Sequence, residues 1–90
     1  MVKKVLIVDD DQEMLLSLEE GLSKYDETFS ILTAEDGLDA IEELKDSTIS
    51  LVVTDLKMPK MDGFSLLSHI MEHYPEIPVI IITGYSTSEM

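Results

Sequence analysis

The segment that decides the fold reads Ile49-Ser50-Leu51-Val52-Val53-Thr54-Asp55-Leu56-Lys57-Met58-Pro59-Lys60-Met61-Asp62-Gly63. Its first half is a short apolar run with two adjacent valines, which is typical of a strand covered on both faces. The run ends in an acid, Asp55, and the stretch that follows contains Pro59 and Gly63, both of which favour turns. The segment therefore predicts a buried strand over 49–54 that delivers a carboxylate to a loop.

Three further stretches predict strands. Val5-Leu6-Ile7-Val8 is followed by Asp9-Asp10-Asp11, and Val79-Ile80-Ile81-Ile82 is followed by Thr83-Gly84. Residues 29–33 form a third, more mixed run. Polar side chains thus follow directly after two of these strands as well.

The segments between the strands have the apolar spacing of amphipathic helices. Asp36 is placed to cap the second helix, Pro75 ends the third, and Asp11 is expected to cap the first. The apolar stripes are predicted at Met14, Leu15, Leu18, Leu22 and Tyr25, at Leu38, Ile41 and Leu44, and at Phe64, Leu67, Ile70, Met71 and Tyr74.

Strict alternation of strands and helices in ninety residues predicts one α/β domain, a doubly wound parallel sheet with right-handed crossovers. A strand order of 2-1-3-4 would bring the residues that follow the strands to one rim. Ligands of open parallel sheets bind at that rim, where the strand order reverses. We therefore expect the functional site there.

The composition excludes several classes of function. Six Lys and no Arg stand against nineteen Asp and Glu, a net charge of −13, which disfavours direct binding to nucleic acid or to an anionic membrane surface. No apolar run approaches the ~18 residues of a spanning helix, and no secretion signal is recognisable. The absence of cysteine excludes disulfides and thiolate chemistry. We expect a cytoplasmic protein.

The expected rim combines Asp9, Asp10, Asp55 and Thr83. Three neighbouring carboxylates repel each other, and a hard divalent cation relieves that repulsion. Oxygen ligands with room for water and a phosphate favour Mg²⁺. One carboxylate could then attack a phosphoryl group, while a hydroxyl and an amide at Thr83-Gly84 hold its oxygens.

Three motifs in this order resemble the receiver domain of two-component response regulators. They are Val8-Asp9-Asp10, the stretch Asp55 to Gly63, and Ile82-Thr83-Gly84. The loop motif Asp-x-x-Met-Pro-x-Met-Asp-Gly is the most specific of them, and the resemblance covers all ninety residues.

The resemblance implies a five-stranded, flavodoxin-like (CheY-like) fold and a signalling phosphoacceptor rather than an enzyme. Asp55 would take a phosphoryl group from a sensor histidine kinase or a phosphotransfer protein. Asp10, Asp55 and the carbonyl of Lys57 would ligate Mg²⁺, and Asp9 would act through water. Thr83 would be the switch hydroxyl, and the phosphate would contact Asp55, Leu56, Lys57, Thr83 and Gly84.

The family also carries a lysine at the end of a fifth strand, whereas the last basic residue here is Lys60. Residues 86–89 have the spacing of a capping box. We therefore expect residues 1–90 to be a C-terminally truncated receiver domain that ends at the start of helix four. The strand at 79–82 would then form an edge, which favours a homodimer or a swapped dimer.

Three alternatives remain at this stage. His69-Ile70-Met71-Glu72-His73 fits the H-x-x-E-H string of a metallopeptidase class, although ordinary exposed histidines account for it better. Asp9-x-Asp11 after a strand resembles the first motif of haloacid-dehalogenase-like phosphatases, with Asp9 as nucleophile. A small metal-binding fragment without switching activity is the third alternative.

Overall fold

The computed structural model describes residues 3–22, 24, 28–46, 48–55 and 63–82. The predicted capping box lies outside these residues, and so does the predicted loop of residues 56–63 except for Gly63, which is the first residue of a helix and not part of a loop. The elements follow the order β1 (Lys3–Val8), α1 (Gln12–Leu22), β2 (Phe29–Ala34), α2 (Gly37–Glu43), β3 (Ile49–Asp55), α3 (Gly63–His73) and β4 (Val79–Ile82).

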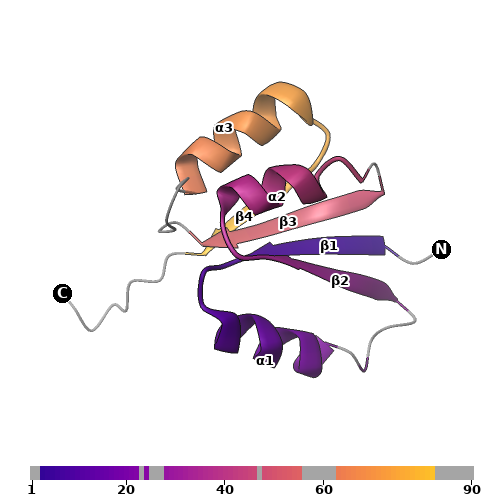
Figure 1. Cartoon of the computed structure of the whole chain (residues 1–90). Helices are drawn as coiled ribbons and strands as arrows, with labels where there is room; N and C mark the ends of the chain where they lie inside the picture. Colours follow the sequence, from indigo (N-terminus) through magenta and orange to yellow (C-terminus); the bar gives the residue numbers. More distant parts are fainter. Residues whose placement is uncertain (1–2, 23, 25–27, 47, 56–62, 83–90) are drawn as a thin grey trace.

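The four strands form one parallel sheet in the order β2-β1-β3-β4. Helix α1 lies on one side of the sheet, and α2 and α3 lie on the other (Figure 1). The predicted doubly wound α/β fold and its strand order are therefore confirmed. Within the described ranges, no helix has both the length and the apolar character needed to cross a bilayer.

The register of β1 against β3 decides where the strands end. Val8 pairs with Thr54, so the next residues, Asp9 and Asp55, lie beside each other at the carboxyl ends of the two strands. The register shifts at the other end, where Lys4 pairs with Ile49 but Val5 pairs with Leu51. This bulge lets Ile49 join the same core as Val52, although an uninterrupted strand would place the two on opposite faces.

The main hydrophobic core lies between the sheet and the pair α2 and α3. Small residues, Gly37 and Ala40 on α2 and Gly63 on α3, are among the buried positions of the two helices. The buried cluster consists of Leu6, Val8, Ala34, Ala40, Leu44, Ile49, Val52, Leu66 and Ile70.

The predicted helix faces are wrong at four positions. Leu38, Phe64 and Met71 are more than half exposed, at 51%, 61% and 64%, and Met14 is 47% exposed. On α3 the buried side chains are Leu66 and Ile70. Gly63, Leu66 and Ile70 form the buried face of α3, and Phe64 and Met71 lie outside it.

Both predicted aspartate caps are confirmed. The carboxylate of Asp11 accepts hydrogen bonds from the backbone N–H groups of Glu13 and Met14, at 3.0 and 3.2 Å. The carboxylate of Asp36 accepts one from Asp39 N–H at 2.8 Å. Because Asp11 satisfies these free amides, α1 begins at Gln12, two residues before its first apolar side chain.

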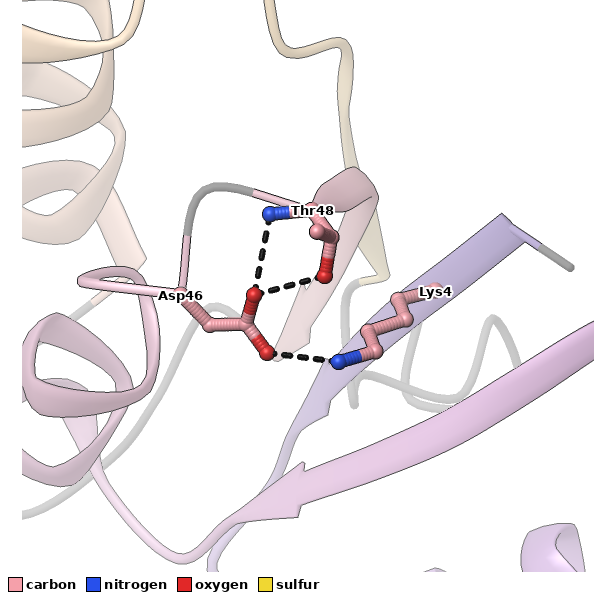
Figure 2. A network of polar contacts seen from close by, with 3 residues as sticks. All are labelled: Lys4, Asp46 and Thr48. Atoms are coloured by element: carbon pink, nitrogen blue, oxygen red, sulfur yellow. Dashed lines mark hydrogen bonds and ion pairs between the residues drawn. The ribbon is translucent and has the colours of Figure 1, made fainter. Parts of the chain in front are cut away.

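An ion pair ties β1 to the turn that precedes β3. Lys4 Nζ donates to a carboxylate oxygen of Asp46 at 2.8 Å, and the N–H and hydroxyl of Thr48 donate to the other oxygen (Figure 2). The bond from Lys4, with those from Thr48, holds the pKa of the Asp46 carboxyl well below its usual range. The network therefore anchors the amino ends of two neighbouring strands.

The α1 side of the sheet is covered less completely. An apolar groove of about 550 Å³ runs along it, and its walls include Val5 and Ile7 of β1, Leu51 and Val53 of β3, and Leu18 and Leu22 of α1. On β4, Ile80 and Ile82 are 51% and 52% exposed. The α2 and α3 side thus holds most of the buried apolar surface.

Replacing Leu66 with Ala tests which stripe of α3 is the buried one. Because Leu66 is fully buried, Leu66→Ala should lower the free energy of unfolding by about 2–5 kcal/mol in chemical denaturation. Phe64→Ala, at the largely exposed position, should cost less than about 1 kcal/mol. The reverse ranking would contradict the packing of α3 described above.

Neutralising Asp46 tests the ion pair at the amino ends. Its lowered pKa means that the pair stabilises the fold above the ordinary carboxyl pKa of about 3.9 and loses this effect as the pH falls below it. Asp46→Asn should therefore lower the melting temperature at neutral pH, and the deficit should shrink in acid. The control is Glu42→Gln, which removes an exposed pair with Lys45 and should have little effect. A deficit that stays constant with pH would argue against this pair.

Candidate functional site

Three carboxylates converge where β1 and β3 end. Ligand oxygens of Asp9, Asp10 and Asp55 all lie within 4.8 Å of one another, and among the described residues no other group of three or more acidic or histidine side chains does so. Asp9 and Asp55 are half-buried, and Asp10 is exposed. The structure thus brings together the three acids that the sequence analysis placed at this rim.

The backbone around Asp9 is fixed by β2 and by the start of α1. Asp9 N–H donates to the carbonyl of Ala34 at 3.1 Å, which extends the pairing of β1 and β2 by one residue. The Asp9 carboxylate accepts a hydrogen bond from Asp11 N–H at 3.0 Å. One carboxylate oxygen of Asp9 is therefore held by the chain itself.

Both burial and the neighbouring negative charges affect the pKa of the Asp9 carboxyl. Burial raises the pKa of Asp9, and the charges of Asp55 and Asp10 raise it further, while the hydrogen bond from Asp11 N–H opposes the shift. A raised pKa in the folded state means that the ionised cluster lowers stability at neutral pH. A bound cation would reverse that effect.

Asp11 does not belong to this cluster. Its carboxylate is directed to the first amides of α1, as the sequence analysis expected for a helix cap. The two adjacent aspartates therefore have different roles: Asp10 belongs to the carboxylate cluster, and Asp11 caps the first turn of α1.

The sequence analysis did not include Thr54 in the site. Its side chain is fully buried, and its hydroxyl donates to the carbonyl of Asp55 at 3.0 Å. This bond fixes the backbone carbonyl of Asp55, the last residue of β3. A hydroxyl directly after the apolar run Leu51-Val52-Val53 is the signal that could have indicated it, because buried polar groups need a partner.

Four of the expected site residues lie outside the described residues. They are Leu56, Lys57, Thr83 and Gly84. Their proposed contacts with metal and phosphate therefore remain predictions.

The two histidines of the H-x-x-E-H string lie on α3, away from this rim. His69 is half-buried and His73 is exposed, and their ring centroids are 4.5 Å apart. Neither contributes to the only convergent group of three or more potential ligands in the described part of the chain.

Comparisons with known proteins agree with this geometry. A transcriptional regulatory protein, GlrR of Escherichia coli K12, is 39% identical over 83 residues, which are 92% of this chain and 18% of that protein. The chain thus spans less than a fifth of the length of this curated relative.

Solved structures give the same result for the fold. The signal receiver domain of an HD domain-containing protein from Pseudomonas fluorescens Pf-5 superposes with a TM-score of 0.87 at 28% identity, over 99% of this chain and 70% of that one. A CheY-like response regulator receiver domain from Methanospirillum hungatei JF-1 gives 0.85 at 29% identity, with the same coverage. The sequence model of the response regulator receiver domain matches residues 5–90, and the chain belongs to that family.

Proposed function

We propose that Asp55 accepts a phosphoryl group from a phosphohistidine of a sensor histidine kinase or of a phosphotransfer protein. The observation that carries this proposal is the convergence of Asp9, Asp10 and Asp55 at the carboxyl ends of the two central strands. Of the three, Asp55 ends β3, and the buried Thr54 hydroxyl holds its backbone carbonyl. Family membership supports this function and does not favour a haloacid-dehalogenase-like phosphatase.

The donor set fits Mg²⁺. All three side chains offer only carboxylate oxygen, and the exposed position of Asp10 leaves room for water and for a phosphoryl oxygen. Asp10 and Asp55 are proposed as direct ligands with the carbonyl of Lys57, and Asp9 acts through water. A bound Mg²⁺ supplies positive charge that offsets the charges of the carboxylates and the incoming phosphoryl group.

The transfer itself needs little from the protein beyond positioning. A carboxylate oxygen of Asp55 forms the new O–P bond as the P–N bond of the phosphohistidine breaks, and the bonding pair leaves with the imidazole nitrogen. Leu56, Lys57, Thr83 and Gly84 are proposed to contact the transferred oxygens. The product is an acyl phosphate on the protein, so the chain acts as a signalling phosphoacceptor.

The partners beyond the phosphodonor are also proposals. In the described part of the chain β4 is an edge strand, and Ile80 and Ile82 expose about half of their surface beside the apolar groove. These features support the proposed homodimer or swapped dimer, because unpaired strand edges and apolar surface favour association. The acidic balance supports the proposed absence of direct nucleic-acid binding. A cytoplasmic location remains part of the proposal.

Labelling with a small phosphodonor tests the phosphoacceptor. The chain should form an acid-stable, base-labile acyl phosphate in the presence of Mg²⁺, and Asp55→Asn should reduce labelling to background in intact-protein mass spectrometry. Asp11→Asn is the matched control, since that carboxylate caps α1 and the amide oxygen keeps the cap. Full labelling of the Asp55→Asn protein would overturn the assignment. Metal binding without any labelling would favour the small metal-binding fragment.

Thermal unfolding tests the cation site. Mg²⁺ should stabilise the fold by about 2.7 kcal/mol at a hundred times its dissociation constant, because it binds the assembled carboxylates and not the unfolded chain. Asp10→Asn should raise the stability without Mg²⁺, through reduced repulsion, and weaken the response to Mg²⁺. Glu13→Gln, which removes an exposed acid on α1 outside the cluster, should leave that response unchanged. An equal response in all three proteins would exclude a specific site.

A further inference from the structure

The proposed phosphoacceptor site does not use the histidine pair of α3. His69 and His73 lie four residues apart, so that their side chains project from consecutive turns on one side of the helix. Their ring centroids are 4.5 Å apart, and the ring planes are inclined by 43°. The two rings therefore lie next to each other and are tilted rather than stacked flat.

We propose that His69 and His73 together chelate one divalent first-row transition metal ion, of the class that includes Zn²⁺, Ni²⁺ and Cu²⁺. Imidazole nitrogen suits these ions and lies about 2.0–2.1 Å from a bound Zn²⁺. Two rings that share one ion at this distance have centroids roughly 5 Å apart. The observed centroid distance of 4.5 Å is close to that value.

The surroundings of the pair favour a cation. His73 is the last residue of α3, where the helix dipole places partial negative charge. The whole chain carries a net charge of −13, which raises the local concentration of cations. The ring of Tyr74 lies 6.1 and 6.5 Å from the two imidazoles and borders the site on one side.

The burial of the two rings suits a two-ligand site. His69 is half-buried, which limits its rotamers, and His73 is exposed, which leaves coordination positions for water. Within the described residues no third acidic or histidine ligand converges with the pair. The site therefore binds an ion with two protein ligands and lacks the third ligand of a catalytic zinc centre, unlike the metallopeptidase alternative.

The pair lies apart from the carboxylate cluster in both space and chemistry. Tyr74, the next residue after His73, lines a pocket with Ile49 at the start of β3, whereas Asp55 ends that strand. A seven-residue strand spans roughly 20 Å. Carboxylate oxygen favours Mg²⁺, and imidazole favours the transition ions, so each site is matched to a different ion.

Zn²⁺ titration of the ninety-residue chain at about pH 7.5, with millimolar Mg²⁺ present, tests the proposal because neutral imidazole is the ligating form. Calorimetry should show one Zn²⁺ per chain, and the ring protons of both histidines should shift together in NMR spectra. His69→Gln and His73→Gln should each weaken binding about tenfold or more, since either change removes the chelate.

Two controls make the outcome decisive. Glu72→Gln removes the exposed acid between the two histidines and should change the Zn²⁺ affinity less than about threefold, within the range of a single surface charge. Asp10→Asn should leave the histidine shifts unchanged. The proposal is overturned if the histidine variants bind Zn²⁺ as tightly as the unaltered chain, or if Asp10→Asn abolishes the binding. Circular dichroism of each variant checks that α3 is intact.

Discussion

The pairing of β1 with β3 is the constraint on which the candidate site depends. Val8 stands opposite Thr54, so Asp9 and Asp55 lie beside each other at the carboxyl ends of the two strands. The sheet thereby holds three carboxylates together, and the pKa of Asp9 is raised first by burial and further by the charges of Asp55 and Asp10. The burial of apolar side chains of the two strands supplies the free energy that keeps the three carboxylates together.

The apolar side chains that support the site are packed more densely on the α2 and α3 side of the sheet than on the α1 side. Val52 and Leu6, in the two central strands, are fully buried under α2 and α3. At the opposite end, the Lys4–Asp46 pair and the bulge before Val5 fix the same two strands. The α1 side contributes less, since part of it is an open apolar groove. The β1–β3 pair is therefore stabilised by the hydrophobic core and, at its amino end, by the Lys4–Asp46 ion pair.

The sequence predicted the fold class, the strand order and the carboxylate cluster because those features rest on strong local signals. Each central strand is a short apolar run that ends in an acid, and parallel strands bring their carboxyl ends to one edge. The helix faces were harder to predict. Of the predicted stripe on α3, Ile70 is buried but Phe64 is exposed, and the buried Gly63 gives no hydrophobic signal in the sequence.

Tertiary detail accounts for what sequence reasoning missed. The bond from the Thr54 hydroxyl to the Asp55 carbonyl depends on the burial of the Thr54 side chain in the folded sheet. Residue spacing along the chain does not indicate this bond. The different roles of Asp10 and Asp11, by contrast, were expected from the sequence, because Asp11 stands where a helix N-cap belongs.

The central claim is that the ends of β1 and β3 form one specific cation site. A Mg²⁺ titration followed by amide NMR, compared with NaCl at equal ionic strength, tests it most directly. The predicted result is saturable shifts that are largest at Asp9, Asp10 and Asp55 and small at Lys4 and Asp46. Shifts that grow without saturation and are equally large at the exposed acids of α1, such as Glu13, Glu19 and Glu20, would contradict it.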